Sequence, residues 1–243
     1  MRAQKAEFKW STLDRNTIAR LIWELRPMVV GIPIKTNKLH SLLSRHIKRK
    51  LPVKVTKIID IDIEKDKVCI GGSYYSDFDR VRKPGIEITL NYRDPNEKIC
   101  LSRGKFRRMS YMFADTLLHE IIHMRQYRRR KFKYIPDYES TAERRDQRVE
   151  QSYLGCHDEI DAHGFNIACE LLDKCYTQKA AAKYLVKKHH RGVLKSISLR
   201  MYLKAFDYNH NHHIIKKLKK RTIMYLPKAE LGRPYLTKDW INR

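Results

Sequence analysis

The 243-residue sequence lacks the features that would place it in or across a membrane. No stretch reaches the roughly 18 consecutive apolar residues that a spanning helix needs. The first residues, MRAQKAEFKWSTLDRN, lack the apolar core of a secretion signal. There is also no long polar low-complexity tract, so the chain is expected to fold. We therefore expect an intracellular protein, in the cytoplasm, a host cytoplasm or near a nucleoid, with no membrane partner.

Cysteine is sparse and unpaired in the sequence. The five cysteines are odd in number and include no C-x-x-C pair. This usage fits a reducing compartment better than a disulfide framework, and it does not favour a structural zinc cluster built from cysteine.

Acidic residues are outnumbered by basic ones almost two to one. The 27 Asp and Glu stand against 52 Lys and Arg, a formal net charge of +25. Because such an excess attracts polyanions, nucleic acid is the first partner to consider. Residues 176–243 alone carry 17 Lys and Arg against three acidic residues, a net +14. The basic residues expected to contact nucleic acid are Arg125, Arg128, Arg129, Arg130, Lys131, Lys133, Arg144, Arg145, Arg148, Lys216, Lys217, Lys219, Lys220 and Arg221.

The order of patterns along the chain predicts an α+β fold. Asp14 and Asn37 are placed to cap two short helices. The segments VKVTKIIDIDIE, KVCIGGS and GIEITLNY then alternate apolar and polar residues, which predicts a small, mostly antiparallel sheet of about three strands. Helical spacing returns from Lys105 onward and again around HDEIDAHGFNIACELLDKC. We expect one domain over residues 1–175 and a basic helical C-terminal extension over 176–243, with an extended arm after Leu226.

The stretch LLHEIIHMRQYRRR, Leu117 to Arg130, carries the clearest chemistry. His119 and His123 lie one helical turn apart, so both imidazoles can reach one metal ion. Glu120 between them can contact a water on that ion. A zinc ion would supply an electrophile and lower the pKa of the water, while Glu120 takes its proton as general base.

A hydrolytic zinc site needs a third protein ligand. Glu159 in HDEIDAHGF is the first candidate, because an antiparallel return could bring its helix alongside the first. His163 lies one turn later on the same face. His163 is either the third ligand in place of Glu159 or a group that orients one of the two imidazoles.

HEIIH followed by EIDAHGFNIACELL resembles the motifs of the ImmA/IrrE group of small gluzincin metallopeptidases, whose second motif has the form E-x-E-A-N-x-F-A-x-x-L-L. Glu159, Ala162 and Phe165 match it; Asp161 replaces glutamate and His163 replaces asparagine. The resemblance spans about residues 55–173. It implies a zincin-like (minigluzincin) domain whose small sheet packs on the HExxH helix, zinc bound by His119, His123 and Glu159, and Glu120 as the base.

A weaker resemblance is to SprT-like proteases, which act on DNA-bound proteins and take a downstream histidine as third ligand. His163 fits that pattern, but no paired-cysteine zinc ribbon follows. The function expected from the sequence is that of a zinc metallopeptidase acting on a protein substrate associated with nucleic acid. The alternative is a viral or mobile-element accessory protein that binds nucleic acid and keeps a structural or degenerate zinc site.

Overall fold

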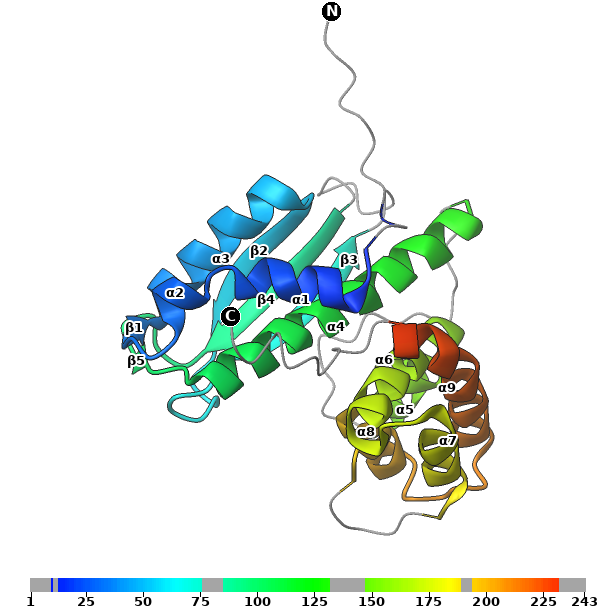
Figure 1. Ribbon diagram of the computed structural model, residues 1–243. Coiled ribbons are helices and arrows are strands. Elements are labelled where there is room, and N and C mark those ends of the chain that lie inside the picture. Colours follow the sequence, from blue (N-terminus) through cyan, green and yellow to red (C-terminus); the bar gives the residue numbers. More distant parts are fainter. Residues whose placement is uncertain (1–9, 11–12, 76–84, 132–146, 189–193, 232–243) are drawn as a thin grey trace, which may run out of the picture. The chain divides into compact units, whose positions relative to one another are not determined.

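A computed structural model describes residues 10, 13–75, 85–131, 147–188 and 194–231. The chain is α+β, with a small sheet and mostly helices (Figure 1). By compactness it divides into two units, Met1–Tyr127 and Arg128–Arg243. A domain boundary after residue 175 stays a prediction.

The first unit contains both sheets and most of the motif helix. Its elements in chain order are α1 (Arg15–Trp23), α2 (Arg26–Val29), β1 (Ile34–Lys35), α3 (Thr36–Lys50), β2 (Val53–Ile59), β3 (Cys69–Tyr75), β4 (Gly85–Tyr92), β5 (Lys98–Ile99) and α4 (Arg103–Arg129), whose last two residues fall in the second unit.

The first of the two predicted helix caps is present and the second is not. Asp14 accepts a hydrogen bond from the Thr17 backbone N–H at 2.8 Å and caps α1, as predicted. Asn37 does not cap α3, which begins at Thr36. The Thr36 and Asn37 N–H groups donate instead to the Glu97 and Pro95 carbonyls, at 3.0 and 3.1 Å. A backbone turn thus satisfies the groups that a capping side chain would have served.

The three-stranded sheet is mixed, which corrects the prediction of a mostly antiparallel one. Its order is β2-β4-β3, with β2 parallel and β3 antiparallel to β4 (Figure 1). The alternation that the sequence shows was enough to find the strands, and in β4 it places Ile86, Ile88, Leu90 and Tyr92 in the core. It could not give strand direction, because side chains alternate with period two in parallel and antiparallel sheets alike. A two-residue antiparallel ladder joins β1 to β5.

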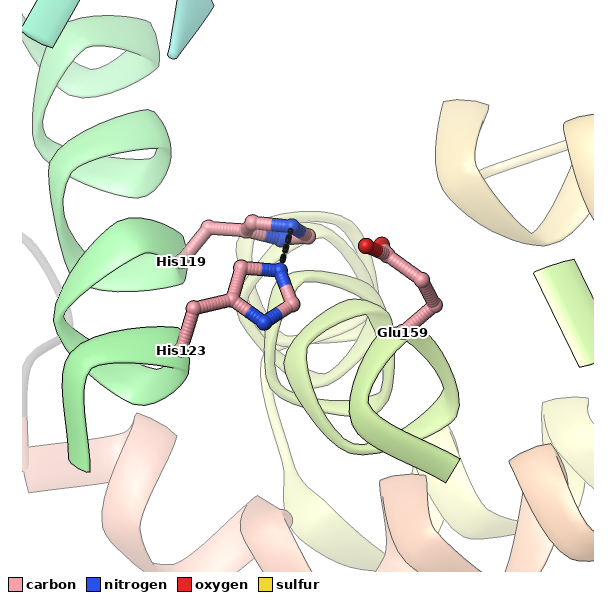
Figure 2. A group of neighbouring side chains, drawn as sticks. All are labelled: His119, His123 and Glu159. Atoms are coloured by element: carbon pink, nitrogen blue, oxygen red, sulfur yellow. Dashed lines mark hydrogen bonds between the residues drawn. The ribbon is translucent and has the colours of Figure 1, made fainter. Parts of the chain in front are cut away.

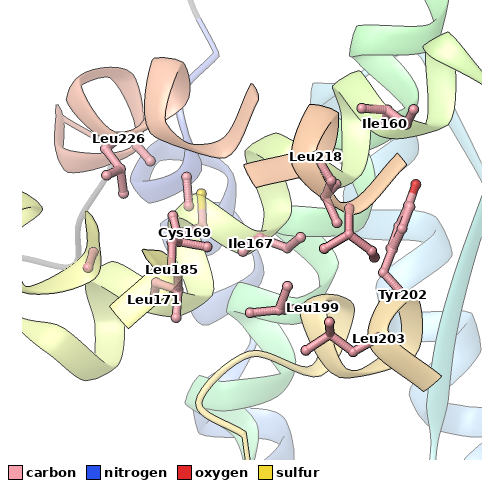
Figure 3. Close-up of a cluster of buried hydrophobic side chains, with 14 of the residues drawn as sticks. Ile160, Ile167, Cys169, Leu171, Leu185, Leu199, Tyr202, Leu203, Leu218 and Leu226 are labelled. Carbon is pink, nitrogen blue, oxygen red and sulfur yellow. The ribbon is translucent and has the colours of Figure 1, made fainter. Parts of the chain in front are cut away.

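The second unit, among its described residues, is helical. It contains α5 (Gln147–Gly155), α6 (His157–Cys175), α7 (Gln178–Val186), α8 (Ile197–Ala205) and α9 (His213–Leu231). Its core gathers apolar residues from all five helices, including Ile167, Leu171, Leu199 and Leu218 (Figure 3). The arm expected after Leu226 is helical as far as Leu231. Residues 232–243, like Lys133, Arg144 and Arg145, lie outside the described part of the chain. None of the described helices is long and apolar enough to cross a membrane.

Candidate metal centre

Helix α4 holds His119, Glu120 and His123 in a buried position. Its apolar residues recur at helical spacing, so the face that carries the motif turns inward with Leu117, Ile121 and Met124. His119 and His123 are 8% and 6% exposed. Buried polar side chains in proteins have hydrogen-bond partners or bind a ligand. The burial of these two histidines therefore indicates that they have such a role.

The two imidazoles present nitrogens to the same point. His119 Nε2 and His123 Nε2 are 3.0 Å apart, and the rings meet edge to face (Figure 2). Two nitrogens bound to one zinc ion at about 2.0–2.1 Å in tetrahedral geometry would be about 3.3 Å apart. The observed spacing is close to that value, so the pair fits a shared ion.

Gln126 fixes the orientation of one of these rings. Its Oε1 lies 2.9 Å from His123 Nδ1, and the amide is buried. Because an amide oxygen can only accept, the tautomer with hydrogen on Nδ1 is favoured, and Nε2 keeps its lone pair. Sequence reasoning did not identify Gln126, although its place three residues after His123 was a signal that a helix partner was available.

Strand β3 comes very close to Glu120 through Gly72. A Cβ built on Gly72 would lie 2.7 Å from Thr116 Cγ2 and 2.8 Å from Glu120 Oε1. Only a residue without a side chain fits there. Strand β3 thus lies against α4 at Glu120. Tyr74 on β3 adds a ring contact with Tyr127 on α4, with centroids 5.6 Å apart.

Helix α6 places Glu159 in its first turn, where the positive end of the helix dipole favours a carboxylate. Glu159 is fully buried. His163 follows one turn later, with Nε2 3.5 Å from Glu159 Oε2. The neighbouring Asp158 belongs to a different contact, a two-pronged ion pair with Arg130 at 2.7 and 2.8 Å.

Helix α9 supports α6 through Asp161. Arg221 Nε lies 2.7 Å from Asp161 Oδ1, and the Tyr225 hydroxyl donates to the same oxygen at 2.8 Å. Burial and this hydrogen bond to a carboxylate raise the pKa of Tyr225, so it remains a donor at ordinary pH. The Asp161 carboxylate is thus held by two side chains of α9.

His119, His123 and Glu159 form a buried group that could hold a metal ion (Figure 2). Their ligand-type atoms all lie within 4.8 Å of one another. Two imidazole nitrogens and one carboxylate oxygen are a donor set found in hydrolytic zinc sites. Among the described residues this is the one such group of His, Cys, Asp and Glu, and it does not include His163.

Comparison of the chain with protein-family models, curated proteins and solved structures finds no match. The resemblance to ImmA/IrrE metallopeptidases, which rests on HEIIH and EIDAHGF, stays a prediction. The roles of Glu120 and Glu159 must therefore be argued from their own surroundings.

The contact of Gln126 with His123 can be tested by substitution. Gln126→Leu removes the acceptor, and we expect zinc affinity to fall by roughly 10–100-fold, the usual effect of losing a group that orients a ligand. Gln126→Glu keeps an oxygen acceptor and should bind zinc much as the wild type does. Competition with a chromophoric chelator measures both. Equal affinity in the Leu variant would show that Gln126 does not orient the ring.

The close approach at Gly72 has a matched control in its neighbour. Gly72→Ala should lower the free energy of unfolding by about 1–3 kcal/mol, because the methyl group collides with Thr116 and Glu120. A Cβ on Gly71 meets no atom of the described chain within 4 Å, so Gly71→Ala should stay within about 0.5 kcal/mol of the wild type. Denaturant unfolding of both variants decides the point; equal stabilities would contradict the packing.

Proposed function

We propose that this protein is a zinc-dependent metallopeptidase that hydrolyses a peptide bond in a protein substrate associated with nucleic acid. The observation that carries the proposal is the buried group of His119, His123 and Glu159 with Glu120 next to the first histidine in the helix. Zinc bound there would supply an electrophile and lower the pKa of a water to about 7.

Glu120 is the residue that would move the proton. It is 5% exposed, so its carboxylate is shielded from bulk solvent, and Gly72 leaves room for it beside the sheet. A carboxylate in this place can take a proton from a water molecule and give it to the amine that leaves the cleaved peptide bond. Gln126 and Asp161 take no part in the proton transfer. Gln126 orients the His123 ring, and Asp161 joins α6 to α9.

We infer that strand β3 is the strand that receives the substrate backbone. The resemblance to metallopeptidases led us to expect that the alternating segment GIEITLNY is the edge strand that pairs with the substrate. That expectation is wrong, because this segment forms β4, which is central in the sheet, with both of its edges paired. β3 is an outer strand of the sheet as described, and its Gly72 lies against Glu120. An extended peptide added to an outer strand gains backbone hydrogen bonds in register, which would bring one carbonyl beside the base.

The decisive variant for the activity is Glu120→Gln. It should bind zinc as the wild type does but lose turnover by about 10²–10⁴-fold, because the amide fills the same space and cannot accept the proton. Glu64→Gln, at an exposed glutamate that pairs with Lys67 on the surface, is the matched control and should keep full activity. Zinc content is measured by elemental analysis, and cleavage on labelled DNA-bound proteins.

Three results of that experiment have distinct meanings. Wild-type cleavage by the Glu120→Gln variant would remove Glu120 from the mechanism. Zinc binding without cleavage by the wild type would favour the alternative, an accessory protein with a structural zinc site. Absence of zinc from the wild type would remove the metallopeptidase proposal altogether.

The exposed face of α9 supports the association with nucleic acid. Lys216, Lys217 and Lys220 are exposed along one side of the helix. Lys219 is half-buried with its Nζ 3.2 Å from His210 Nδ1, and Arg221 pairs with Asp161. The surface that can meet phosphates is therefore narrower than the run of five cations suggests.

Neutralising this face tests its role. The triple variant Lys216→Gln, Lys217→Gln, Lys220→Gln should weaken binding to a DNA duplex and reduce the slope of log K against log salt by up to about 3, since each phosphate contact contributes about 0.9. Lys38→Gln, Lys48→Gln, Arg49→Gln removes the same charge from the exposed face of α3. If both triple variants lose the same DNA affinity, binding depends on net charge alone, and the lysines of α9 are not a specific contact surface.

A further inference from the structure

Helix α9 exposes two adjacent apolar side chains on its outer side. Ile223 is 43% exposed and Met224 is 64% exposed. Large apolar residues that are scattered singly over a surface are ordinary. The others that the described part of the second unit exposes, Tyr176, Val186 and Ile197, each stand alone in the sequence. The pair on α9 is different, because its two side chains share one side of a helix.

The pair lies within a stripe that carries lysine on both sides of it. The exposed residues of α9 recur at three- and four-residue intervals, which is the spacing of one helix side. They are His213, Lys216, Lys217, Lys220, Ile223, Met224, Pro227 and Lys228. Residues 213–229 include no Asp or Glu. The charge of this stripe is therefore positive, with an apolar centre.

The core of the second unit holds this part of α9 in place. Leu218 and Leu226, on the inner side of the helix, are buried in that core (Figure 3). Arg221 is paired with Asp161 at 2.7 Å, and its Nη1 lies 4.0 Å from Met224 Sδ. The apolar pair thus projects from an anchored helix, and a contact surface on a helix is held more precisely than one on a loop.

A partner of this stripe must carry negative charge on both sides of an apolar surface. A DNA duplex does so, since its stacked bases lie between two phosphate backbones. An anionic bilayer matches less well, because a helix that lies in a membrane interface needs a broad apolar face. This stripe has two large apolar side chains besides Pro227. It therefore fits a duplex better than a lipid surface.

The spacing of the lysines suits the minor groove of DNA. Lys220 and Lys228 are eight residues apart, a rise of about 12 Å along the helix. The minor groove is about 6 Å wide, so two lysine side chains at this spacing can reach the phosphates on either side of it. Between them stand an isoleucine and a methionine, which are among the side chains that minor-groove proteins insert between base steps.

We propose that Ile223 and Met224 form an apolar wedge that enters a base step of a DNA duplex while the lysines of the stripe meet the flanking phosphates. This inference rests on the proposed association with nucleic acid and not on the peptidase chemistry. It also names the class of DNA that binds best. A duplex whose stack is already open, at an unpaired base or a flexible step, is favoured because the wedge does not have to separate stacked bases.

The test compares binding of the full chain to two DNA duplexes of equal length, one fully paired and one with a single unpaired base at its centre. The wild type should bind the second duplex roughly tenfold more tightly, because its stack is already open. The double variant Ile223→Gln, Met224→Gln should bind both duplexes alike. The matched control is Val186→Gln, Ile197→Gln, which removes exposed apolar side chains from α7 and α8 and should keep the preference.

Two further measurements distinguish the wedge from a general effect on structure. The variant Ile223→Val, Met224→Leu keeps both side chains apolar, so it should keep the preference for the duplex with the unpaired base. The fluorescence of 2-aminopurine at a TA step of the paired duplex should rise when the wild type binds, because the wedge unstacks the base. Binding of the Gln double variant should leave that fluorescence unchanged.

The results separate the wedge from the proposed function. Equal binding of both duplexes by the wild type, or a preference that survives in the Gln double variant, overturns the wedge and leaves the association with nucleic acid standing. Absence of duplex binding by the wild type overturns both. Binding to phosphatidylserine vesicles that the Gln double variant loses, together with equal binding of the two duplexes, overturns the wedge in favour of a lipid surface. Glu120→Gln should show the wild-type preference, since the wedge takes no part in peptide hydrolysis.

Discussion

The constraint on which the structure depends is the cost of burying carboxylates in a strongly basic chain. A buried charge is tolerated only where an opposite charge or a set of hydrogen bonds compensates it. In the second unit arginine meets this constraint, because Arg130 pairs with Asp158 and Arg221 pairs with Asp161. In the first unit the buried partner is the cation, since Arg15 is buried and pairs with the partly exposed Asp115. Glu120 and Glu159 are also buried, yet each belongs to a helix turn that carries a histidine one or four residues away. A buried carboxylate beside imidazoles is also the arrangement that hydrolytic zinc sites use.

Two glycines make these arrangements possible by allowing close approach. Gly72 lets β3 lie against Glu120, and Gly164 lets α9 lie against α6, where an added Cβ would come within 2.9 Å of Arg221 Cγ. The second approach brings the Arg221 side chain alongside α6, one turn from Asp161, so that the ion pair can form. In both places a glycine on one element leaves the space that a charged side chain on another element occupies: Glu120 beside Gly72, and Arg221 beside Gly164. Packing density, more than any single bond, thereby sets the position of the polar groups.

The sequence could predict features that depend on neighbouring residues, and it could not predict features that depend on contacts between distant parts of the chain. His119, Glu120 and His123 were identifiable because their relation is local: one helical turn fixes it. The strands and the Asp14 cap are local as well, and they were found. Glu159 was reached only through a family resemblance and an assumed antiparallel return. Strand order, the two-residue strands β1 and β5, and the failed cap at Asn37 depend on segments far apart in the chain. Gln126 carried a local signal, its place three residues after His123, but the helix also offered other polar neighbours. Gly72 escaped prediction because nothing in its own neighbourhood distinguishes a glycine in a close contact from one without.

Helix α9 carries two kinds of basic residue: an arginine that pairs with a carboxylate inside the unit, and lysines that are exposed to solvent. Arginine has a planar fork that pairs with a carboxylate and a long apolar stem that packs, so Arg221 lies on the inner side with its stem over Gly164. Lysine is a strongly hydrated point charge, and Lys216, Lys217 and Lys220 stand in solvent on the outer side. One helix therefore both holds Asp161 on α6 and presents a cationic face. The exposed lysines and the contacts that hold the helix of Glu159 therefore lie on opposite sides of one helix of the second unit.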